Sequence, residues 1–163
     1  MKRVFVIGAF LVGSFITNEL RAQATDDDIQ IVQGAWGKQK RELVSAAMQL
    51  SEKDSVKFWP VYERYETARK KLGKERIKIL DQYATNFEKL TAVQTDDIVA
   101  RLFKNEAGYN ALLQQYYAEV KKSLNSMQAA KFLHIESFLQ NYIKTSIQAN
   151  IPYIGALEKE EKK

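Results

Sequence analysis

An apolar stripe at helical spacing runs through the middle of the chain. It recurs in steps of three, four or seven at Phe58, Val61, Tyr65, Ala68, Leu72, Ile79, Tyr83, Phe87 and Leu90. This period gathers the side chains on one face of an α-helix. Helix breakers are scarce, because the 163 residues include only two prolines and seven glycines. The pattern therefore predicts long helices and argues against an all-β fold.

A long helix needs a partner that covers its stripe, and the residues that follow supply one. The second stripe comprises Ile98, Leu102, Tyr109, Leu112, Leu113, Tyr116, Val120 and Leu124. We expect an all-α fold of about four helices in antiparallel hairpins, with a long hairpin over residues 52–124. A short helix over residues 36–48 precedes it. Pro60 directly follows Trp59 and predicts a kink early in the hairpin.

The expected fourth helix, over residues 126–150, is apolar on nearly all sides. Its apolar residues are Ala129, Ala130, Phe132, Leu133, Ile135, Phe138, Leu139, Tyr142, Ile143 and Ile147. A helix of this kind lies in the middle of a core or in a dimer interface. The sequence therefore predicts a possible homodimer. Pro152 is expected to end the helix.

The junctions between the expected helices share a form. Each closes one helix with a leucine and opens the next with a hydroxyl and a polar group that can return to it. The three junctions are Leu50-Ser51-x-x-Asp54, Leu90-Thr91-x-x-Gln94 and Leu124-x-Ser126-x-Gln128. We expect Ser51 and Ser126 to cap their helices, and Thr95 is a second capping candidate beside Thr91.

The amino terminus has the features of a cleavable signal peptide over residues 1–24. Lys2 and Arg3 precede an apolar run over residues 4–16, and Ala22-Gln23-Ala24 supplies the small-x-small cleavage pattern. The run of about 13 residues is shorter than the roughly 20 that span a bilayer, although an uncleaved anchor is the alternative. The chain lacks the cysteine that a bacterial lipid anchor requires. We therefore expect a periplasmic or secreted protein, cleaved after Ala24.

The remaining chain has the size of one domain. Residues 25–35 are expected to form a flexible arm, 36–157 a single helical domain and 158–163 a charged tail. Cleavage removes Lys2, Arg3, Arg21 and Glu19, so the mature chain is closer to neutral than the full chain at +5. Nucleic acid is therefore not an expected partner, and no membrane segment remains after cleavage.

The second junction is literally L-T-x-x-Q, at Leu90, Thr91 and Gln94. With the leader, the lack of cysteine and the long hairpins, the chain resembles the Spy/CpxP-like (LTxxQ) periplasmic stress proteins over about residues 40–150. The resemblance implies ATP-independent binding of unfolded clients, or restraint of an envelope stress sensor. The first junction departs from the pattern, because Ser51 and Asp54 replace the threonine and glutamine.

Nothing in the sequence predicts an enzyme, a cofactor or a metal. His134 is the only histidine, cysteine is absent, and no phosphate loop or nucleophile elbow occurs. Glu136 is expected on a different helix face from His134. A hydrolase or metalloprotein, the third class considered, would instead need a buried constellation of polar groups.

Basic and aromatic residues supply the candidate binding surface. A basic stretch over residues 69–78 is either a solvated helix face or a client-binding patch, and adjacent aromatics provide either a second core face or exposed contacts. The candidates are Trp59, Tyr62, Arg69, Lys70, Lys74, Arg76, Phe103 and Tyr117. The leading hypothesis is a chaperone or envelope-stress modulator that binds protein clients. The alternative is a structural or assembly protein of the cell envelope, without chaperone activity, whose fourth helix forms a dimer or docks on an envelope partner.

Overall fold

The computed structural model describes the backbone of residues 26–148 and the side chains of residues 36–147. Four helices follow one another: α1 (Asp26–Met48), α2 (Glu52–Asn86), α3 (Ala92–Ser123) and α4 (Ser126–Gln148), with a short 3-10 turn, η1 (Phe87–Lys89), after α2. No strand occurs within these residues, so the predicted all-α class is confirmed. The expected leader and charged tail lie outside the described part of the chain.

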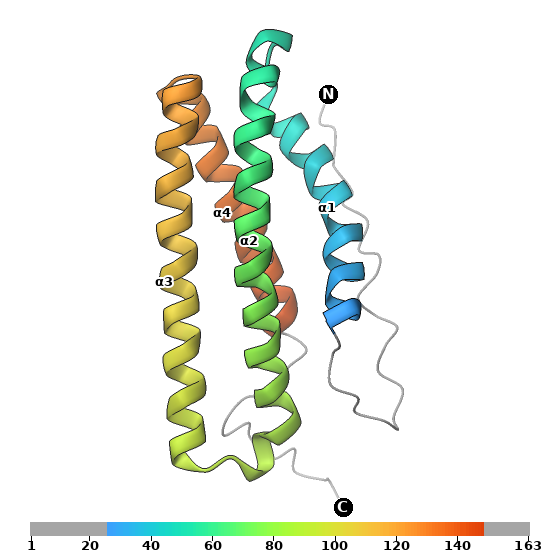
Figure 1. The fold of residues 1–163 in the computed structure, drawn as a ribbon, viewed down its shortest axis with the longest axis vertical. Helices are drawn as coiled ribbons and strands as arrows, with labels where there is room; N and C mark the ends of the chain where they lie inside the picture. The colour runs from blue at the N-terminus through green and yellow to red at the C-terminus, as the bar shows by residue number, and fades with distance from the viewer. Residues whose placement is uncertain (1–25, 149–163) are drawn as a thin grey trace, which may run out of the picture.

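The long helices α2 and α3 pack side by side and antiparallel (Figure 1). The Tyr65 and Tyr116 rings meet at 5.4 Å near one end, and Arg101 donates to the side chain of Gln82 at 2.8 Å near the other. The shorter helices α1 and α4 pack beside the half of this pair that lies farther from η1, so the tip of the α2–α3 pair extends past them (Figure 1). None of the described helices is both long and apolar enough to cross a membrane.

Two separate apolar clusters stabilise the bundle. The larger lies where all four helices meet and contains Val44, Met48, Phe58, Val61, Tyr62, Tyr65, Tyr116, Val120, Ala129, Phe132 and Leu139. The smaller lies near the tip, where Ile79 and Tyr83 of α2 meet Ile98 of α3. A two-helix tip buries less apolar surface than a four-helix layer, so most of the hydrophobic stabilisation comes from the larger cluster.

Two of the expected caps are present. Ser51 accepts a hydrogen bond from the backbone N–H of Asp54 at 3.2 Å. Thr91 accepts one from the N–H of Gln94 at 3.3 Å, and the Gln94 side chain accepts the Thr91 N–H at 3.0 Å, which completes a capping box. The prediction that Thr95 caps this helix is wrong. Helix α3 already begins at Ala92, and the Thr95 hydroxyl donates to the carbonyl of Thr91.

The third junction corrects the prediction for Ser126. The side chain of Asn125 accepts a hydrogen bond from the backbone N–H of Gln128 at 3.0 Å. Ser126 is the first residue of the helix. Asparagine is as good a cap as serine. With Asn125 as the cap, all three junctions share one spacing, in which the cap follows a leucine and the polar return residue stands three positions later.

One helix boundary also differs from expectation. The first helix begins at Asp26 and not near Trp36, so residues 26–35, expected as a loose arm, are helical. The second helix is continuous through Pro60, and the kink expected there stays a prediction. Proline cannot donate to the carbonyl one turn earlier and normally costs about 3 kcal/mol in a helix interior. The packing of Phe58 and Val61 on either side of Pro60 favours the helical path despite this cost.

Candidate functional site

A cluster of charged and tyrosine side chains lies inside the four-helix part of the bundle. Lys40 of α1 is 1% exposed and donates to Glu136 of α4 at 2.7 Å. Two hydroxyls from α2 donate to the same carboxylate, from Tyr62 at 3.0 Å and from Tyr65 at 2.7 Å. Glu136 thus receives three hydrogen bonds and connects three helices.

The second carboxylate of the cluster is Glu66 of α2. It pairs with Lys40 across the α1–α2 boundary, and it accepts two hydrogen bonds from Arg69, one turn later, at 2.7 and 3.1 Å. The Lys40 ammonium also lies 5.6 and 5.3 Å from the ring centroids of Tyr62 and Tyr65, within the range of a cation–π contact. We call these six residues the ionic cluster: Lys40, Tyr62, Tyr65, Glu66, Arg69 and Glu136.

The environment shifts the pKa values of several members. Burial lowers the pKa of Lys40, although both carboxylates oppose it. Burial alone would raise the pKa of Glu66, but this side chain is 15% exposed, and the charge of Lys40 and the hydrogen bonds from Arg69 lower its pKa instead. Burial and then the charge of Glu136 raise the pKa of Tyr62 and Tyr65, so both hydroxyls stay protonated donors.

The geometry of the ionic cluster suits a structural role. Two carboxylates face two basic groups, and none of the six side chains has a buried polar atom without a partner. Within the described residues, no group of three or more histidine or acidic side chains is arranged to hold a metal. The arrangement can fix the position of α1 against α2 and α4, because an unpaired charge buried there would be costly.

The aromatic candidates do not form one open surface. Tyr62 belongs to the core and the ionic cluster. Trp59 and Tyr117 are half-buried against the larger apolar cluster, and Arg41 stacks on the Trp59 ring at 4.0 Å. Only Phe103, which is 72% exposed on α3, projects freely. The structure therefore does not bring these four aromatic residues together on one concave face.

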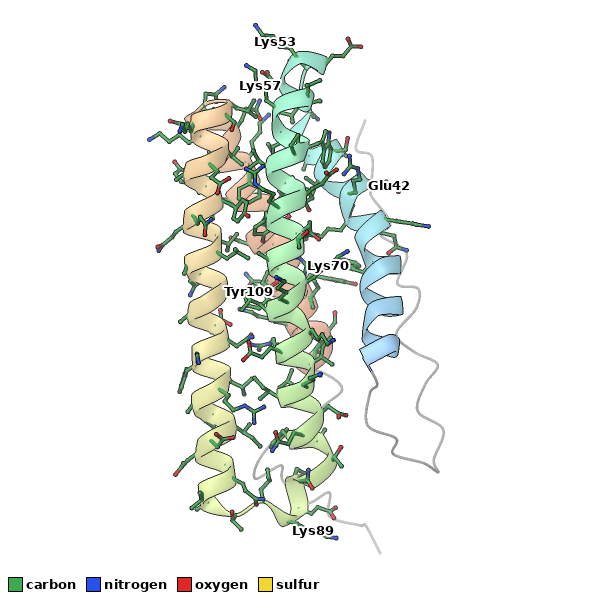
Figure 2. All side chains as sticks on the ribbon, in the orientation of Figure 1. Glu42, Lys53, Lys57, Lys70, Lys89 and Tyr109 are labelled. Atoms are coloured by element: carbon green, nitrogen blue, oxygen red, sulfur yellow. The ribbon has the colours of Figure 1, made fainter. Side chains whose placement is uncertain are left out.

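The basic candidates also lie apart from one another. Arg69 is buried in the ionic cluster, and the largely buried Arg76 lies 3.6 Å from Glu106 of α3. Lys70 points from α2 toward α1, where it lines an open groove of about 360 Å³ (Figure 2). Lys74 is half-buried. The stretch therefore divides between an interior position and several helix faces, and it is not one exposed patch.

A different exposed surface lies on α1 and on α4, the helix that was expected to lie in a core or an interface. His134, Phe138 and Tyr142 follow one another at intervals of four on α4, and all three are exposed, Phe138 by 54% and Tyr142 by 50%. Their spacing places them on one side of the helix. Leu43 and Ala47 are exposed at the same interval on α1. We call these residues, with the exposed Met127, the α1–α4 face.

The register of the two helices brings one end of the α4 stripe to the level of the α1 stripe. Lys40 contacts Glu136, and the ammonium of Lys131 lies 3.5 Å from the carbonyl oxygen of Met48, so α1 and α4 run antiparallel. Leu43 and Ala47 fall between the two contacts on α1, and His134 falls between them on α4. His134 therefore lies at the level of Leu43 and Ala47, whereas Phe138 and Tyr142 lie beyond the Lys40–Glu136 contact.

The α1–α4 face carries little charge. From Phe132 to Ile143, no exposed residue of α4 is an aspartate, glutamate, lysine or arginine, since Glu136 is buried. Lys131, just before this stretch, is half-buried beside the end of α1. The exposed residues after Glu42 on α1 are uncharged as well. By contrast, exposed charges follow α2 and α3, among them Glu63, Arg64, Lys71, Glu75, Asp96, Asp97, Lys104, Lys121 and Lys122.

One feature of the sequence could have indicated both the ionic cluster and the α1–α4 face. Glu136 lies on the core side of α4 with Phe132 and Leu139, where a carboxylate requires partners, whereas Phe138 lies on another side of the helix. An apolar helix that also carries an inward carboxylate has a buried polar site and an outward apolar surface. The expected separation of Glu136 from His134 is confirmed, because the first is buried and the second exposed.

No known protein family, characterised protein or solved structure matches this chain. The likeness to the Spy/CpxP-like proteins therefore stays a prediction that rests on the junctions and the leader.

Proposed function

We propose that this chain is an exported, non-enzymatic protein that binds other proteins through the α1–α4 face. Its partners would be protein segments that expose apolar side chains, such as unfolded clients. Binding would need no ATP, because the contact is an apolar surface that is already formed. The compartment would be the periplasm or the cell exterior, in keeping with the leader-like residues 1–24.

The observation that carries this proposal is the exposure of Phe138 and Tyr142 on a stretch of α4, residues 132–143, whose exposed side chains include no aspartate, glutamate, lysine or arginine. Aromatic residues and methionine are enriched in the cores of protein interfaces, while lysine and acidic residues are depleted there. A contiguous exposed apolar patch is a common mark of an interaction site. The residues of the α1–α4 face fit this composition.

The ionic cluster supports a binding role over a catalytic one. Its carboxylates, Glu66 and Glu136, are each satisfied by basic or hydroxyl partners, and Lys40 is 1% exposed. A general base or nucleophile must reach the substrate in some pose. The groups of the cluster are instead directed at one another.

A second candidate function is favoured by one feature of the same face. An uncharged, aromatic surface suits a permanent contact, because obligate interfaces are more apolar than transient ones. The chain would then be an assembly protein of the cell envelope, with the face of α4 held by one fixed partner. Such a protein would not protect unrelated clients from aggregation.

An aggregation assay tests the proposal. The full chain, expressed with its leader and purified after export, is mixed with a denatured client at equal molar amounts. We expect lower light scattering with the wild type and loss of this protection in the Phe138→Ser Tyr142→Ser variant. Phe103→Ser, which alters an exposed phenylalanine outside the face, is the control and should protect fully.

The outcome distinguishes the candidates. If the wild type leaves the client aggregating at its normal rate, the client-binding function is wrong and the assembly function is favoured. If the control loses protection while the Phe138→Ser Tyr142→Ser variant keeps it, the binding surface lies on α3 and not on the α1–α4 face.

A further inference from the structure

We infer that α1 is a releasable cover, and that the groove it occupies against α2 and α4 binds a lysine-bearing amphipathic helix of another protein in its place. Helix α1 packs against both of these helices. Its inward side consists of Trp36, Lys40, Val44 and Met48, which follow one another at intervals of four. The groove is a different site from the α1–α4 face, so the inference goes beyond the proposed function.

Three features weaken the attachment of α1. The Lys40 ammonium gives up its hydration, because the side chain is 1% exposed. The indole nitrogen of Trp36 is buried and has no hydrogen-bond partner within the described residues. Gln49, directly after the helix, has a φ of 47°, a left-handed conformation that is unfavourable for a residue with a side chain. Release of α1 returns Lys40 and Trp36 to water and lets Gln49 relax, which offsets part of the lost apolar contact.

The contacts that shape the groove do not involve α1. Phe132 of α4 meets Phe58 and Tyr65 of α2 edge to face, with ring centroids 6.4 and 5.1 Å apart. The Tyr65 hydroxyl donates to Glu136 of α4 at 2.7 Å. The groove between α2 and α4 is therefore already formed when α1 leaves, and a partner helix need not build it.

The charges in the groove specify the partner. Glu66 and Glu136 are two negative groups, and Arg69 supplies one positive group, so one negative charge remains uncompensated once Lys40 has left. A helix that fills the groove must bring a cation, since a purely apolar helix would bury this charge unpaired. A lysine supplies it as a compact ammonium in the place of Lys40, and apolar residues four and eight positions later take the places of the next two inward residues of α1.

Peptide binding to the full exported chain tests the groove. The probe is a fluorescent peptide with the sequence of residues 26–48, and fluorescence anisotropy measures its binding. Val44→Ser weakens the attachment of the chain's own α1, so this variant should bind the peptide about ten-fold more tightly than the wild type. Leu43→Ser, the matched change at an exposed neighbour, should bind it as the wild type does.

Two further arms test the recognition. A peptide whose only change is Lys40→Ala should bind the Val44→Ser chain about ten-fold more weakly, because the charge in the groove stays uncompensated. Adding Phe138→Ser and Tyr142→Ser to the Val44→Ser chain should leave peptide binding unchanged, since both of these side chains are exposed while α1 is in place.

Native-state hydrogen exchange of the wild type provides a measurement that needs no variant. The amides of residues 40–48 should exchange through an opening that needs less free energy, and depends less on denaturant, than the opening of α2. This comparison decides the release of α1 even if Val44→Ser does not fold.

Amides of α1 that exchange only when the whole bundle unfolds overturn the inference. A Val44→Ser chain that keeps its helical circular dichroism yet binds the peptide no better than the wild type overturns it too, as does equal binding of the Lys40→Ala peptide. The proposed function fails separately, because protection of a client depends on Phe138 and Tyr142, whereas peptide binding in the groove does not.

Discussion

Phe58 of α2 and Phe132 of α4 meet edge to face in the core, with ring centroids 6.4 Å apart. Each is the eighth residue after the leucine that closes a junction, Leu50 in the first case and Leu124 in the second. Both are fully buried. The two junctions thus deliver equivalent side chains to one point, so the local capping signal also sets the register of the core.

The next core turn repeats this relationship. Tyr62 and Glu136 stand four residues after Phe58 and Phe132, and the hydroxyl of Tyr62 donates to the carboxylate of Glu136 at 3.0 Å. Equivalent positions of α2 and α4 therefore form an aromatic contact and then a hydrogen bond.

The aromatic contact predicts a large effect of truncation. Phe132→Ala should lower the free energy of unfolding by about 3–5 kcal/mol, because it leaves a cavity at a fully buried position. Phe103→Ala, at a side chain that is mostly exposed, should change it by less than about 0.5 kcal/mol. Urea denaturation followed by circular dichroism measures both, and equal effects would contradict the assignment of Phe132 to the core.

The ionic cluster predicts a cost for removing one partner. Glu136→Leu should destabilise the fold by about 3–5 kcal/mol, because Lys40 loses one of its two carboxylates and two hydroxyls lose their acceptor. Adding Lys40→Met should recover part of the loss, since the pair is coupled. The exposed Arg41–Glu63 pair is the matched control, and Glu63→Leu should cost less than about 1 kcal/mol. Additive losses in the double variant would argue against the coupling.

The lowered pKa of Glu66 predicts a dependence of stability on acid. A carboxyl whose folded pKa lies below its unfolded value stabilises the fold above the unfolded pKa, near 4.5, and this contribution is lost as the pH falls through the folded pKa. The free energy of unfolding should therefore decline more steeply below about pH 4.5 in the wild type than in Glu66→Gln. Parallel curves for the two proteins would show that Glu66 has no lowered pKa.

The corrected cap at the third junction can be tested by two adjacent substitutions. Asn125→Ala should lower the free energy of unfolding by about 1 kcal/mol, because the N–H of Gln128 loses its acceptor. Ser126→Ala should have an effect within about 0.5 kcal/mol, since Ser126 is an exposed first helical residue. The reverse order of effects would restore Ser126 as the cap.

Periodicity predicted most of the fold, because helix faces are determined by residues close in sequence. The stripes that contain Phe58 and Ile98 lie in the core as expected. Helix caps were harder to predict, since serine, threonine and asparagine can all fill this role. Residue type alone does not decide which of two neighbours, such as Asn125 and Ser126, is the cap. The start of α1 was missed because three aspartates and Gly34 were taken as signs of a loose segment, although Ile29, Val32 and Trp36 stand at helical spacing.

The candidate site was predicted less well, for a physical reason. Lys40, Glu66 and Glu136 come from three helices, and only tertiary packing brings them together. The aromatic candidates were chosen by residue type, yet neighbouring residues on a helix point in different directions. As a result Tyr62 lies in the core, while Phe103 is exposed. The α1–α4 face depends on which side of an apolar helix remains uncovered, and this follows from the placement of α1 beside α4.

The most direct measurement of the central claim is site-specific photo-cross-linking to a bound protein. A photoreactive phenylalanine analogue is placed at position 138 in one variant and at position 103 in another, and each is illuminated with a denatured client. We expect cross-links to the client from position 138 and few or none from position 103. Cross-links that form equally from both positions, or from position 103 alone, would contradict binding through the α1–α4 face.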